Sequence, residues 1–294
     1  MAVRLLIRRQ SWGRDEQALA RRARRFFGSP KPLQWLSTRG LRSIPVREEA
    51  VRGEWLESKQ PENDGIIFYI HGGGFVSCSS KTHRPITATL ARLTSFRVFS
   101  LDYRLAPEHR FPAALDDVET AYKWLLEQRS ADKIALAGDS AGGNLLLGLL
   151  LRLRDAGISL PACAVCFSAW TDLEGTGESV RQNANRCAMF YPENIPQFAA
   201  AYLGETTQPS LYSSPVQASF ENFPPMLFQV GSTEILLDDS CRIHQKIREH
   251  GGTSQLEIYD NVFHCWQMLN NFIPEARTAL EQAAKFVRRH ISPN

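Results

Sequence analysis

The stretch Lys-Ile-Ala-Leu-Ala-Gly-Asp-Ser-Ala-Gly-Gly-Asn, residues 133–144, decides the fold class of this 294-residue chain. A run of small and branched apolar residues ends at Gly138, and an amphipathic helical stretch begins near Ala141. Ser140 therefore lies on a tight turn between a strand and a helix, where flanking glycines let the backbone pass without a Cβ clash. A glycine-flanked serine also occurs by chance, but this setting favours a nucleophile whose oxygen is exposed above a sheet.

The rest of the chain alternates short apolar runs with longer amphipathic stretches. This alternation predicts an α/β fold, with a mostly parallel central sheet and helices on both faces. We expect strands at Val51–Glu57, Ile66–Ile70, Val98–Leu101, Ile134–Ala137, Ala162–Phe167, Met226–Val230 and Leu256–Tyr259. We expect helices at residues 14–27, Ala113–Gln128, Ala141–Asp155, Asp239–His250 and Glu275–Arg289.

Two regions interrupt the alternation, residues 1–40 and roughly residues 176–213. Insertions of this kind usually lie at the carboxyl ends of the strands, where open α/β sheets bind ligands. We therefore predict an N-terminal cap segment at 1–40 and a catalytic domain at 41–294, with a second cap insertion near 176–213. Together they would form a small helical cap over the site.

The composition is that of a soluble globular protein, with 43% hydrophobic and 22% charged residues. No apolar run approaches the roughly 20 residues of a membrane span. Residues 1–25 carry eight Arg against two acidic residues, although the whole chain has a formal charge of only +3. The body lacks the basic stripe of a nucleic-acid binder. We interpret the basic arm as the solvated face of a helix, with contact to anionic lipid or a partner as the alternative.

Six cysteines are spread along the chain without a disulfide framework. Cys163 and Cys166 form the one CxxC pair, inside a predicted buried strand. We interpret them as small buried hydrophobes rather than as a zinc or redox site. With no apolar leader segment evident, we expect a reducing, cytoplasmic compartment.

The glycines of His71-Gly72-Gly73-Gly74-Phe75 directly follow the predicted strand Ile66–Ile70. They can turn their N–H groups towards one point, as an oxyanion hole requires, and the N–H of Ala141 would add a further donor. A plain flexible turn or a phosphate cradle is the alternative, but a phosphate loop would end in Lys and Ser or Thr.

A serine nucleophile needs a base that is held by an acid. Of seven histidines, His264 follows the last predicted strand, whereas His71 more simply braces the glycine loop. Glu234 comes first after the strand Met226–Val230, and Asp238 follows one helical turn later. We favour Glu234 as the acid, while Asp238, which could instead charge the first turn of the next helix, stays open.

Together these motifs resemble the hormone-sensitive lipase family of α/β-hydrolase esterases. The resemblance rests on His-Gly-Gly-Gly at 71–74, Asp-Tyr-Arg-Leu-Ala-Pro-Glu at 102–108 and Gly-Asp-Ser-Ala-Gly-Gly at 138–143. It implies the α/β-hydrolase fold, an N-terminal helical cap, no metal or organic cofactor, and a homodimer formed through the last strand and helix. It also implies Ser140 as nucleophile and His264 as base, with an oxyanion loop in which Gly72 shapes the turn and Gly73, Gly74 and Ala141 donate.

Within the motif at 102–108, Arg104 and Glu108 are expected to pair with each other. The chain departs from the family at the acid, where Glu-Ile-Leu-Leu-Asp at 234–238 replaces the usual Asp-Pro-Leu-x-Asp. It departs again at Phe-His-Cys-Trp, residues 263–266, and we expect Cys265 and Trp266 to narrow the pocket near the base.

The sequence thus predicts a serine carboxylesterase that uses water and a covalent acyl-enzyme to hydrolyse short- to medium-chain acyl esters. A lactone hydrolase or an acetyl-hydrolase of a small molecule would use the same residues, and a non-catalytic ligand-binding relative is an alternative of another class. A lipase for long-chain emulsions is disfavoured, because no long exposed apolar lid is evident. The candidate pocket residues, for which core packing is the alternative, are Phe75, Trp170, Met189, Phe190 and Tyr191.

Overall fold

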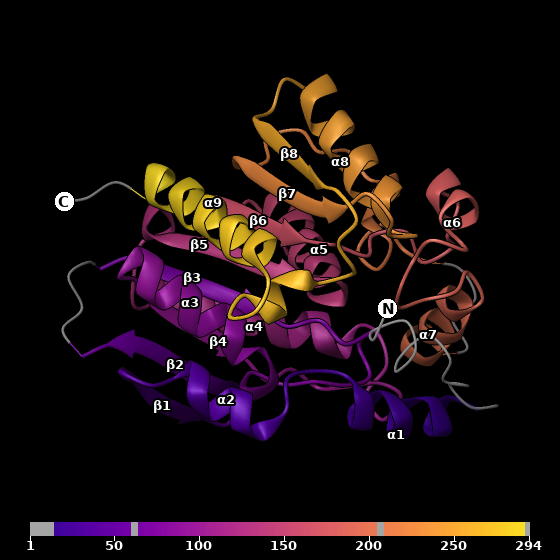
Figure 1. The fold of residues 1–294 in the computed structure, drawn as a ribbon. Helices are drawn as coiled ribbons and strands as arrows, with labels where there is room; N and C mark the ends of the chain where they lie inside the picture. Colours follow the sequence, from indigo (N-terminus) through magenta and orange to yellow (C-terminus); the bar gives the residue numbers. More distant parts are fainter. Residues whose placement is uncertain (1–14, 60–63, 205–208, 292–294) are drawn as a thin grey trace.

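A central eight-stranded sheet organises the molecule (Figure 1). The computed structural model describes residues 15–59, 64–204 and 209–291. The spatial order is β1-β2-β4-β3-β5-β6-β7-β8, with β1 and β2 antiparallel to their neighbours and all other pairs parallel. The strands are β1 (Leu41–Arg47), β2 (Arg52–Ser58), β3 (Ile66–Ile70), β4 (Arg97–Leu101), β5 (Ile134–Asp139), β6 (Cys163–Phe167), β7 (Met226–Gly231) and β8 (Ser254–Tyr259).

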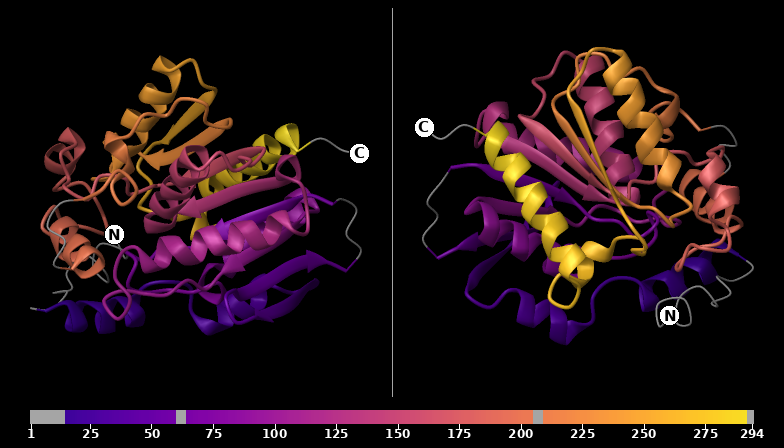
Figure 2. Two further views of the ribbon diagram at one scale, coloured as in Figure 1. Left: turned by 180° about the vertical axis from the view of Figure 1, so that it is seen from behind. Right: turned by 45° about the horizontal axis from the view of Figure 1, so that its top comes forward.

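Helices cover both faces of this sheet, so the predicted α/β architecture is confirmed. On one face lie α3 (Arg84–Thr94) and α9 (Pro274–His290), which are in front in Figure 1. On the other lie α4 (Ala113–Leu126), α5 (Ala141–Asp155) and α8 (Leu237–Glu249), and α4 and α5 come forward in the reverse view of Figure 2. Because both faces are covered, the central strands β3, β5, β6 and β7 are buried along their whole length.

The alternation of side chains along β6 places the two cysteines of the CxxC pair on opposite faces of the sheet. Cys163 packs into the core under α3 and α9, whereas Cys166 packs into the opposite core. Residues three apart on a strand point to opposite faces, so these two sulfurs cannot meet or share a metal. Both thiols are free, and burial raises the pKa of Cys163 to about 12. Their interpretation as buried hydrophobes is confirmed.

The elements predicted from the sequence are present, with ends that differ by a few residues. Outside the two predicted cap regions, β1 and α3 were not predicted from the sequence. The pattern of β1 is half exposed and contains Pro45, which is tolerated because β1 is an edge strand. In α3, Pro85 and three threonines obscure the helical period, although Pro85 stands at the first turn where proline fits.

Helices α1 (Glu16–Phe26), α6 (Glu178–Gln182) and α7 (Asn194–Leu203) gather at the end of the sheet towards which the parallel strands point (Figure 1). Helix α2 (Lys31–Ser37) lies apart from them, near β1 in Figure 1, and packs on α3. Asp15 caps α1, since its carboxylate accepts a hydrogen bond from the Ala18 N–H at 2.6 Å. Leu19, Ala20 and Ala23 form the buried side of α1, whereas Phe26 at its end is 37% exposed.

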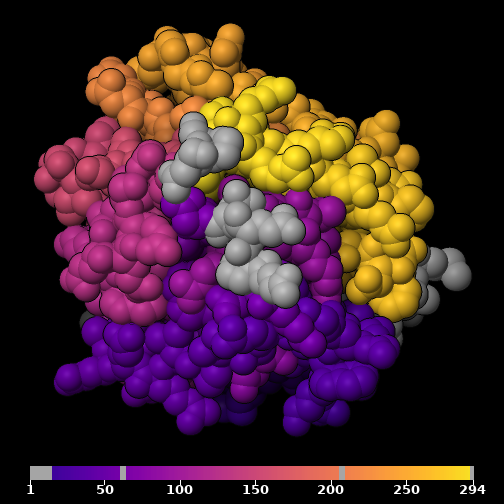
Figure 3. Space-filling model, turned by 90° about the vertical axis from the view of Figure 1, so that its left-hand side faces the viewer, coloured from indigo at the N-terminus to yellow at the C-terminus, as the bar shows by residue number. Residues whose placement is uncertain are grey.

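The N-terminal part of the chain forms a continuous layer along one side of the molecule, drawn in indigo in Figure 3. Phe27, just after α1, stacks on Phe198 of α7 at 6.1 Å and meets the edge of Phe190 at 5.9 Å. The two regions that interrupt the sequence alternation therefore contact each other. In the ranges given above, no helix has both the length and the apolar character needed to cross a bilayer.

Candidate active site

Ser140 sits on the turn that joins β5 to α5. Its φ of +51° is rare for a residue with a side chain, and its N–H donates to the Phe167 carbonyl at 2.9 Å. The turn is tight, because a Cβ on Gly142 would collide with the Ile70 carbonyl oxygen and one on Gly138 would lie 2.7 Å from the Gly142 carbonyl. The glycines around Ser140 are therefore required by close approach of the backbone.

Glu234 and His264 form a buried pair. His264 Nδ1 donates to Glu234 Oε2 at 2.6 Å, and the two side chains are 4% and 1% exposed. The other carboxylate oxygen of Glu234 accepts hydrogen bonds from Ser168 Oγ and the Gly231 N–H, both at 2.7 Å. Because both oxygens are engaged, the imidazole is held in one orientation with Nε2 as its remaining nitrogen.

Ser140 and His264 line the same pocket, although Ser140 Oγ makes no hydrogen bond to His264 among the described residues. Contacts of this kind often tighten only when substrate binds. Asp238, the alternative acid, has another role: it accepts the Ser179 N–H at 2.8 Å and thereby joins α6 to α8. The structure thus brings Glu234, and not Asp238, to His264.

Three N–H groups around Ser140 have no acceptor in the described part of the chain: those of Gly73 and Gly74 in the glycine loop, and that of Ala141 directly after Ser140. Ala141 is the first residue of α5, where a helix has no internal acceptor for its N–H. Gly72 differs, because its N–H donates to Asp139 Oδ1 at 3.0 Å. Gly72 is therefore not available as a donor of the hole and shapes the turn instead.

His71 supports the glycine loop through a contact with the Gly72 carbonyl. Its Nδ1 lies 2.7 Å from the Gly72 carbonyl oxygen, so Nδ1 carries the proton, and its ring stacks on Tyr103 at 4.2 Å. Burial and the neighbouring His83 lower the pKa of His71 to about 4. A neutral, packed imidazole of this kind supports the loop rather than transferring protons.

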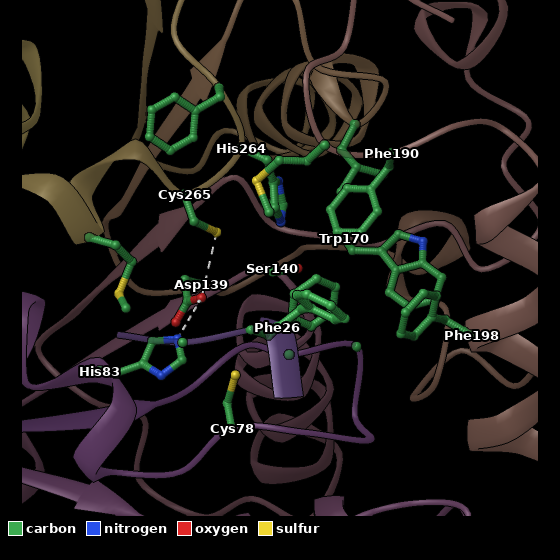
Figure 4. A pocket seen from close by; sticks show the side chains of 18 of the residues that line it. Phe26, Cys78, His83, Asp139, Ser140, Trp170, Phe190, Phe198, His264 and Cys265 are labelled. Carbon is green, nitrogen blue, oxygen red and sulfur yellow. Dashed lines mark hydrogen bonds and ion pairs between the residues drawn. The ribbon is translucent and has the colours of Figure 1, made fainter. Parts of the chain in front are cut away.

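Asp139, the residue before Ser140, anchors the loop to the sheet. Besides the Gly72 N–H, its carboxylate accepts from Tyr69 Oη at 2.7 Å and from His83 Nε2 at 3.2 Å. Burial opposes ionisation of Asp139, but His83 and Tyr69 outweigh it and hold its pKa at about 2. The Cys265 thiol donates to the same carboxylate at 3.5 Å (Figure 4).

A mostly apolar pocket of about 240 Å³ opens over Ser140 and His264 (Figure 4). Trp170, Met189 and Phe190 line it as expected, and Phe190 meets the His264 ring edge-on at 5.2 Å. Further apolar lining residues come from the N-terminal segment, α7 and the region after β7 and β8: Phe26, Phe27, Leu33, Ile195, Phe198, Leu236, Phe263, Met268 and Leu269.

Comparison with known proteins places this architecture in a family. Residues 67–268 match the model of an α/β-hydrolase fold family. A crystal structure of an esterase from the bacterial hormone-sensitive lipase family superposes with a TM-score of 0.87 at 34% identity, covering 98% of this chain and 95% of that one. The chain belongs to the hormone-sensitive lipase family of α/β hydrolases.

Two curated relatives of this hydrolase are similar over most of their length. An esterase of Acinetobacter venetianus is 38% identical over 82% of this chain and 80% of its own. An acetyl-hydrolase of Streptomyces hygroscopicus is 36% identical over 80% of this chain and 79% of its own.

Two expected pocket residues of this hydrolase lie elsewhere. The Phe75 ring is fully buried and stacks on Tyr202, with centroids 3.7 Å apart, so it packs in the core below the pocket. Tyr191 is 39% exposed and does not line the pocket. Of the two residues after His264, Cys265 lines the pocket, whereas Trp266 is buried against Tyr259.

The expected pairing of Arg104 with Glu108 is wrong. Arg104 instead makes a bidentate contact with Asp117 of α4, with its closest distance at 2.7 Å. Glu108 accepts two hydrogen bonds from Arg24 of α1, at 2.6 and 2.8 Å. Arg24 also donates to the Val76 and Ala106 carbonyls, so these contacts join α1 to the glycine loop and to the segment that contains Glu108.

Sequence reasoning missed other contributors to this site. Ser168 donates a hydrogen bond to Glu234. The one feature of the sequence that could have indicated its role is its position, since it is a polar residue directly after the buried strand β6. Met268 and Leu269 follow His264 in the short η5 helix (Trp266–Leu269) and carried no motif. The described residues contain no group of three or more His, Cys, Asp or Glu side chains that could hold a metal ion.

Proposed function

We propose that this hydrolase is a serine carboxylesterase of short- to medium-chain acyl esters, with Ser140, His264 and Glu234 as its catalytic triad. Its relatives include proteins named esterase and acetyl-hydrolase, and the chain is a serine ester hydrolase by family. The observation that carries the assignment of residues is the buried Glu234–His264 hydrogen bond beside the pocket that contains Ser140.

In the first half of the reaction, Ser140 Oγ attacks the acyl carbon while His264 Nε2 takes its proton. Glu234 keeps the other proton on Nδ1 and stabilises the imidazolium that forms. Negative charge then develops on the former carbonyl oxygen, and the N–H groups of Gly73, Gly74 and Ala141 are positioned to stabilise it. His264 next donates its proton to the leaving alcohol, which breaks the ester bond and leaves the acyl group on Ser140.

In the second half, His264 accepts a proton from water as the water oxygen attacks the acyl carbon. The tetrahedral anion forms against the same three N–H groups. Its collapse returns the proton from His264 to Ser140 Oγ and releases the carboxylic acid. No external oxidant, reductant or cofactor takes part in either half.

The pocket supports a preference for small esters. Its volume of about 240 Å³ is below the roughly 300–1,000 Å³ of sites for drug-sized ligands. Its lining is largely aromatic and aliphatic, which suits an acyl chain without charge. The relative named acetyl-hydrolase supports a second candidate, removal of an acetyl group from a small molecule. A lactone is a third substrate that the same residues could open.

We assign residues 1–40 and the insertion near 176–213 to a cap. The contact of Phe27 with Phe190 and Phe198 supports this assignment for the described part of both regions. A homodimer through the edge strand β8 is supported by Ile258, which is 49% exposed there. The six free cysteines support a reducing, cytoplasmic compartment.

Initial rates on p-nitrophenyl esters from acetyl to palmitoyl, measured for the wild type and Ser140→Ala, test the proposal. We expect a maximum at short acyl chains and loss of at least about 10³-fold of the rate in the variant. A maximum confined to acetyl would favour the acetyl-hydrolase. A folded variant that retains the wild-type rate would overturn the assignment of Ser140.

A further inference from the structure

We infer that the surface formed by α1 and α2 beside the pocket binds an anionic lipid bilayer. The inference goes beyond the proposed esterase and rests on it only for the benefit that docking would bring to catalysis. We call this surface the α1–α2 face and define it by Arg21, Arg25, Phe26, Lys31, Trp35, Leu36 and Arg39.

Exposed apolar side chains are concentrated on this face. Among the described residues, seven large hydrophobic side chains are exposed, and three of them lie within eleven residues: Phe26, Trp35 and Leu36. Trp35 is 67% exposed and Leu36 is 46% exposed. Single exposed apolar residues are ordinary on a protein surface, but a cluster of them marks an interaction site.

The charge of the same segment selects the partner. Residues 17–40 contain six Lys or Arg and no Asp or Glu. Arg24 is engaged by Glu108, while Arg21, Arg25, Lys31 and Arg39 are exposed. Cations interleaved with aromatic and aliphatic side chains are the composition of helices that lie in the headgroup region of anionic membranes.

The local geometry places cation and apolar group together. The Arg25 guanidinium lies 5.9 Å from the centre of the Phe26 ring, and that of Arg39 lies 5.8 Å from the Trp35 ring. An aromatic ring beside a guanidinium suits the bilayer interface, where the ring enters the acyl boundary while the cation meets lipid phosphates.

The α1–α2 face is continuous with the pocket. Phe26 is 37% exposed and also lines the pocket (Figure 4). Leu33 of α2 is another lining residue. Leu269 of η5 also lines the pocket, and the Phe272 N–H donates to its carbonyl at 2.8 Å. Phe272 is 67% exposed, and α2 and η5 both pack on α3.

This continuity gives the docking a function. A bilayer bound at the α1–α2 face would meet the rim of the pocket at Phe26 and Leu33. Esters dissolved in the membrane would then reach Ser140 without first entering bulk water. The substrate class that follows is amphiphilic esters that partition into anionic bilayers and present a small acyl group to the pocket.

Sedimentation of the protein with vesicles tests the inference. We would compare phosphatidylcholine vesicles with vesicles containing about one third phosphatidylglycerol, the latter to supply negative surface charge. Ser140→Ala, which keeps lipids intact, would be measured beside the wild type. We expect binding to the anionic vesicles only, equal in both proteins, and lost at about 1 M NaCl, where charges are screened within about 3 Å.

Variants locate the binding surface. Arg25→Gln combined with Arg39→Gln should weaken partitioning roughly 25-fold, since each cation near an anionic surface contributes about fivefold, or about 1 kcal/mol. Trp35→Ala should weaken it at least about tenfold. Arg289→Gln and Leu211→Ala are matched controls, because both residues are exposed and lie outside the α1–α2 face. Unlike Ser140→Ala, these surface variants should keep the wild-type rate on dissolved p-nitrophenyl butyrate.

Three results would overturn the inference. The first is a wild type that stays in the supernatant with anionic vesicles. The second is binding that the controls reduce as much as Trp35→Ala does. The third is a drop from dimer to monomer caused by Trp35→Ala without lipid, since the face would then join copies of the chain. The rate on dissolved ester separates these results from failure of the esterase proposal, because it needs no vesicle.

Discussion

Replacing Glu234 by glutamine removes one negative charge from the buried contact with His264 and keeps the size of the side chain. The amide oxygen can still accept from Ser168 and the Gly231 N–H, as Oε1 of Glu234 does at 2.7 Å. The amide nitrogen would then face His264 Nδ1. Because an NH₂ group can only donate, Nδ1 must lose its proton and Nε2 must gain one, which removes the base that Ser140 needs.

The size of the loss follows from the geometry. During acylation His264 becomes a cation next to the carboxylate, whose oxygen is 2.6 Å from Nδ1. Opposite charges about 4 Å apart attract by about 4 kcal/mol at an effective dielectric of about 20. This free energy corresponds to about 10³-fold in rate, and the wrong tautomer adds to it. We therefore expect kcat to fall by roughly 10³- to 10⁴-fold.

The assay is kcat and KM on p-nitrophenyl butyrate, with circular dichroism to establish that each variant is folded. Asp238→Asn is the matched control, because its carboxylate lies in the same segment but accepts the Ser179 N–H instead. We expect that control to change kcat by less than about threefold, since no charge near His264 is lost. Equal losses in the two variants, or a loss below about tenfold for Glu234→Gln, would refute the assignment of Glu234.

Two further predictions concern Phe27, which follows α1, and the buried Asp239 of α8. Phe27→Ala removes a ring that lines the pocket, so the ratio of decanoate to butyrate hydrolysis should rise several-fold while the chain stays folded; an unchanged ratio would contradict a specificity role. Burial raises the pKa of Asp239 to about 7 from an ordinary value of 3.8. The unfolded chain therefore releases this proton first, and the free energy of unfolding falls as the pH rises from about 4 through about 7. Asp239→Asn has no group that titrates at this position, so its stability should not fall in this way. The difference in free energy of unfolding, variant minus wild type, should therefore increase by about 2–3 kcal/mol between pH 5 and pH 8 in urea titrations. A difference that is constant with pH would mean that Asp239 ionises normally.

Much of the fold could be predicted from the sequence because it is encoded locally. A strand buried on both faces must be apolar throughout, and Ile66–Ile70 has the same bounds in the sequence analysis and in the structure. The turn at Ser140 was predictable because it requires glycine on both sides of the serine, and glycines are visible in the sequence. In the structure, Gly138 and Gly142 approach backbone atoms too closely to allow a Cβ. The edge strand β1 escaped prediction because one exposed side leaves no continuous apolar run.

Contacts between side chains that are distant in sequence could not be predicted in this way. Arg104 and Glu108 are four residues apart and of opposite charge, yet each pairs with another helix, Asp117 of α4 and Arg24 of α1. Phe75 stands beside the glycine loop in sequence but stacks on Tyr202, 127 positions further along the chain, in the core. Side-chain direction in an irregular loop is set by packing, which has no signature in the neighbouring residues.

The sequence by itself determined the strand–turn–helix around Ser140 and the glycine loop, because each depends on residues close together in the chain. Only the tertiary structure decided that Glu234 rather than Asp238 contacts His264 and that the Gly72 N–H is occupied by Asp139. It also decided that the N-terminal segment lines the pocket. Those outcomes depend on how β5, β7 and the loop after β8 meet at one edge of the sheet, and that arrangement is fixed by packing across the whole chain.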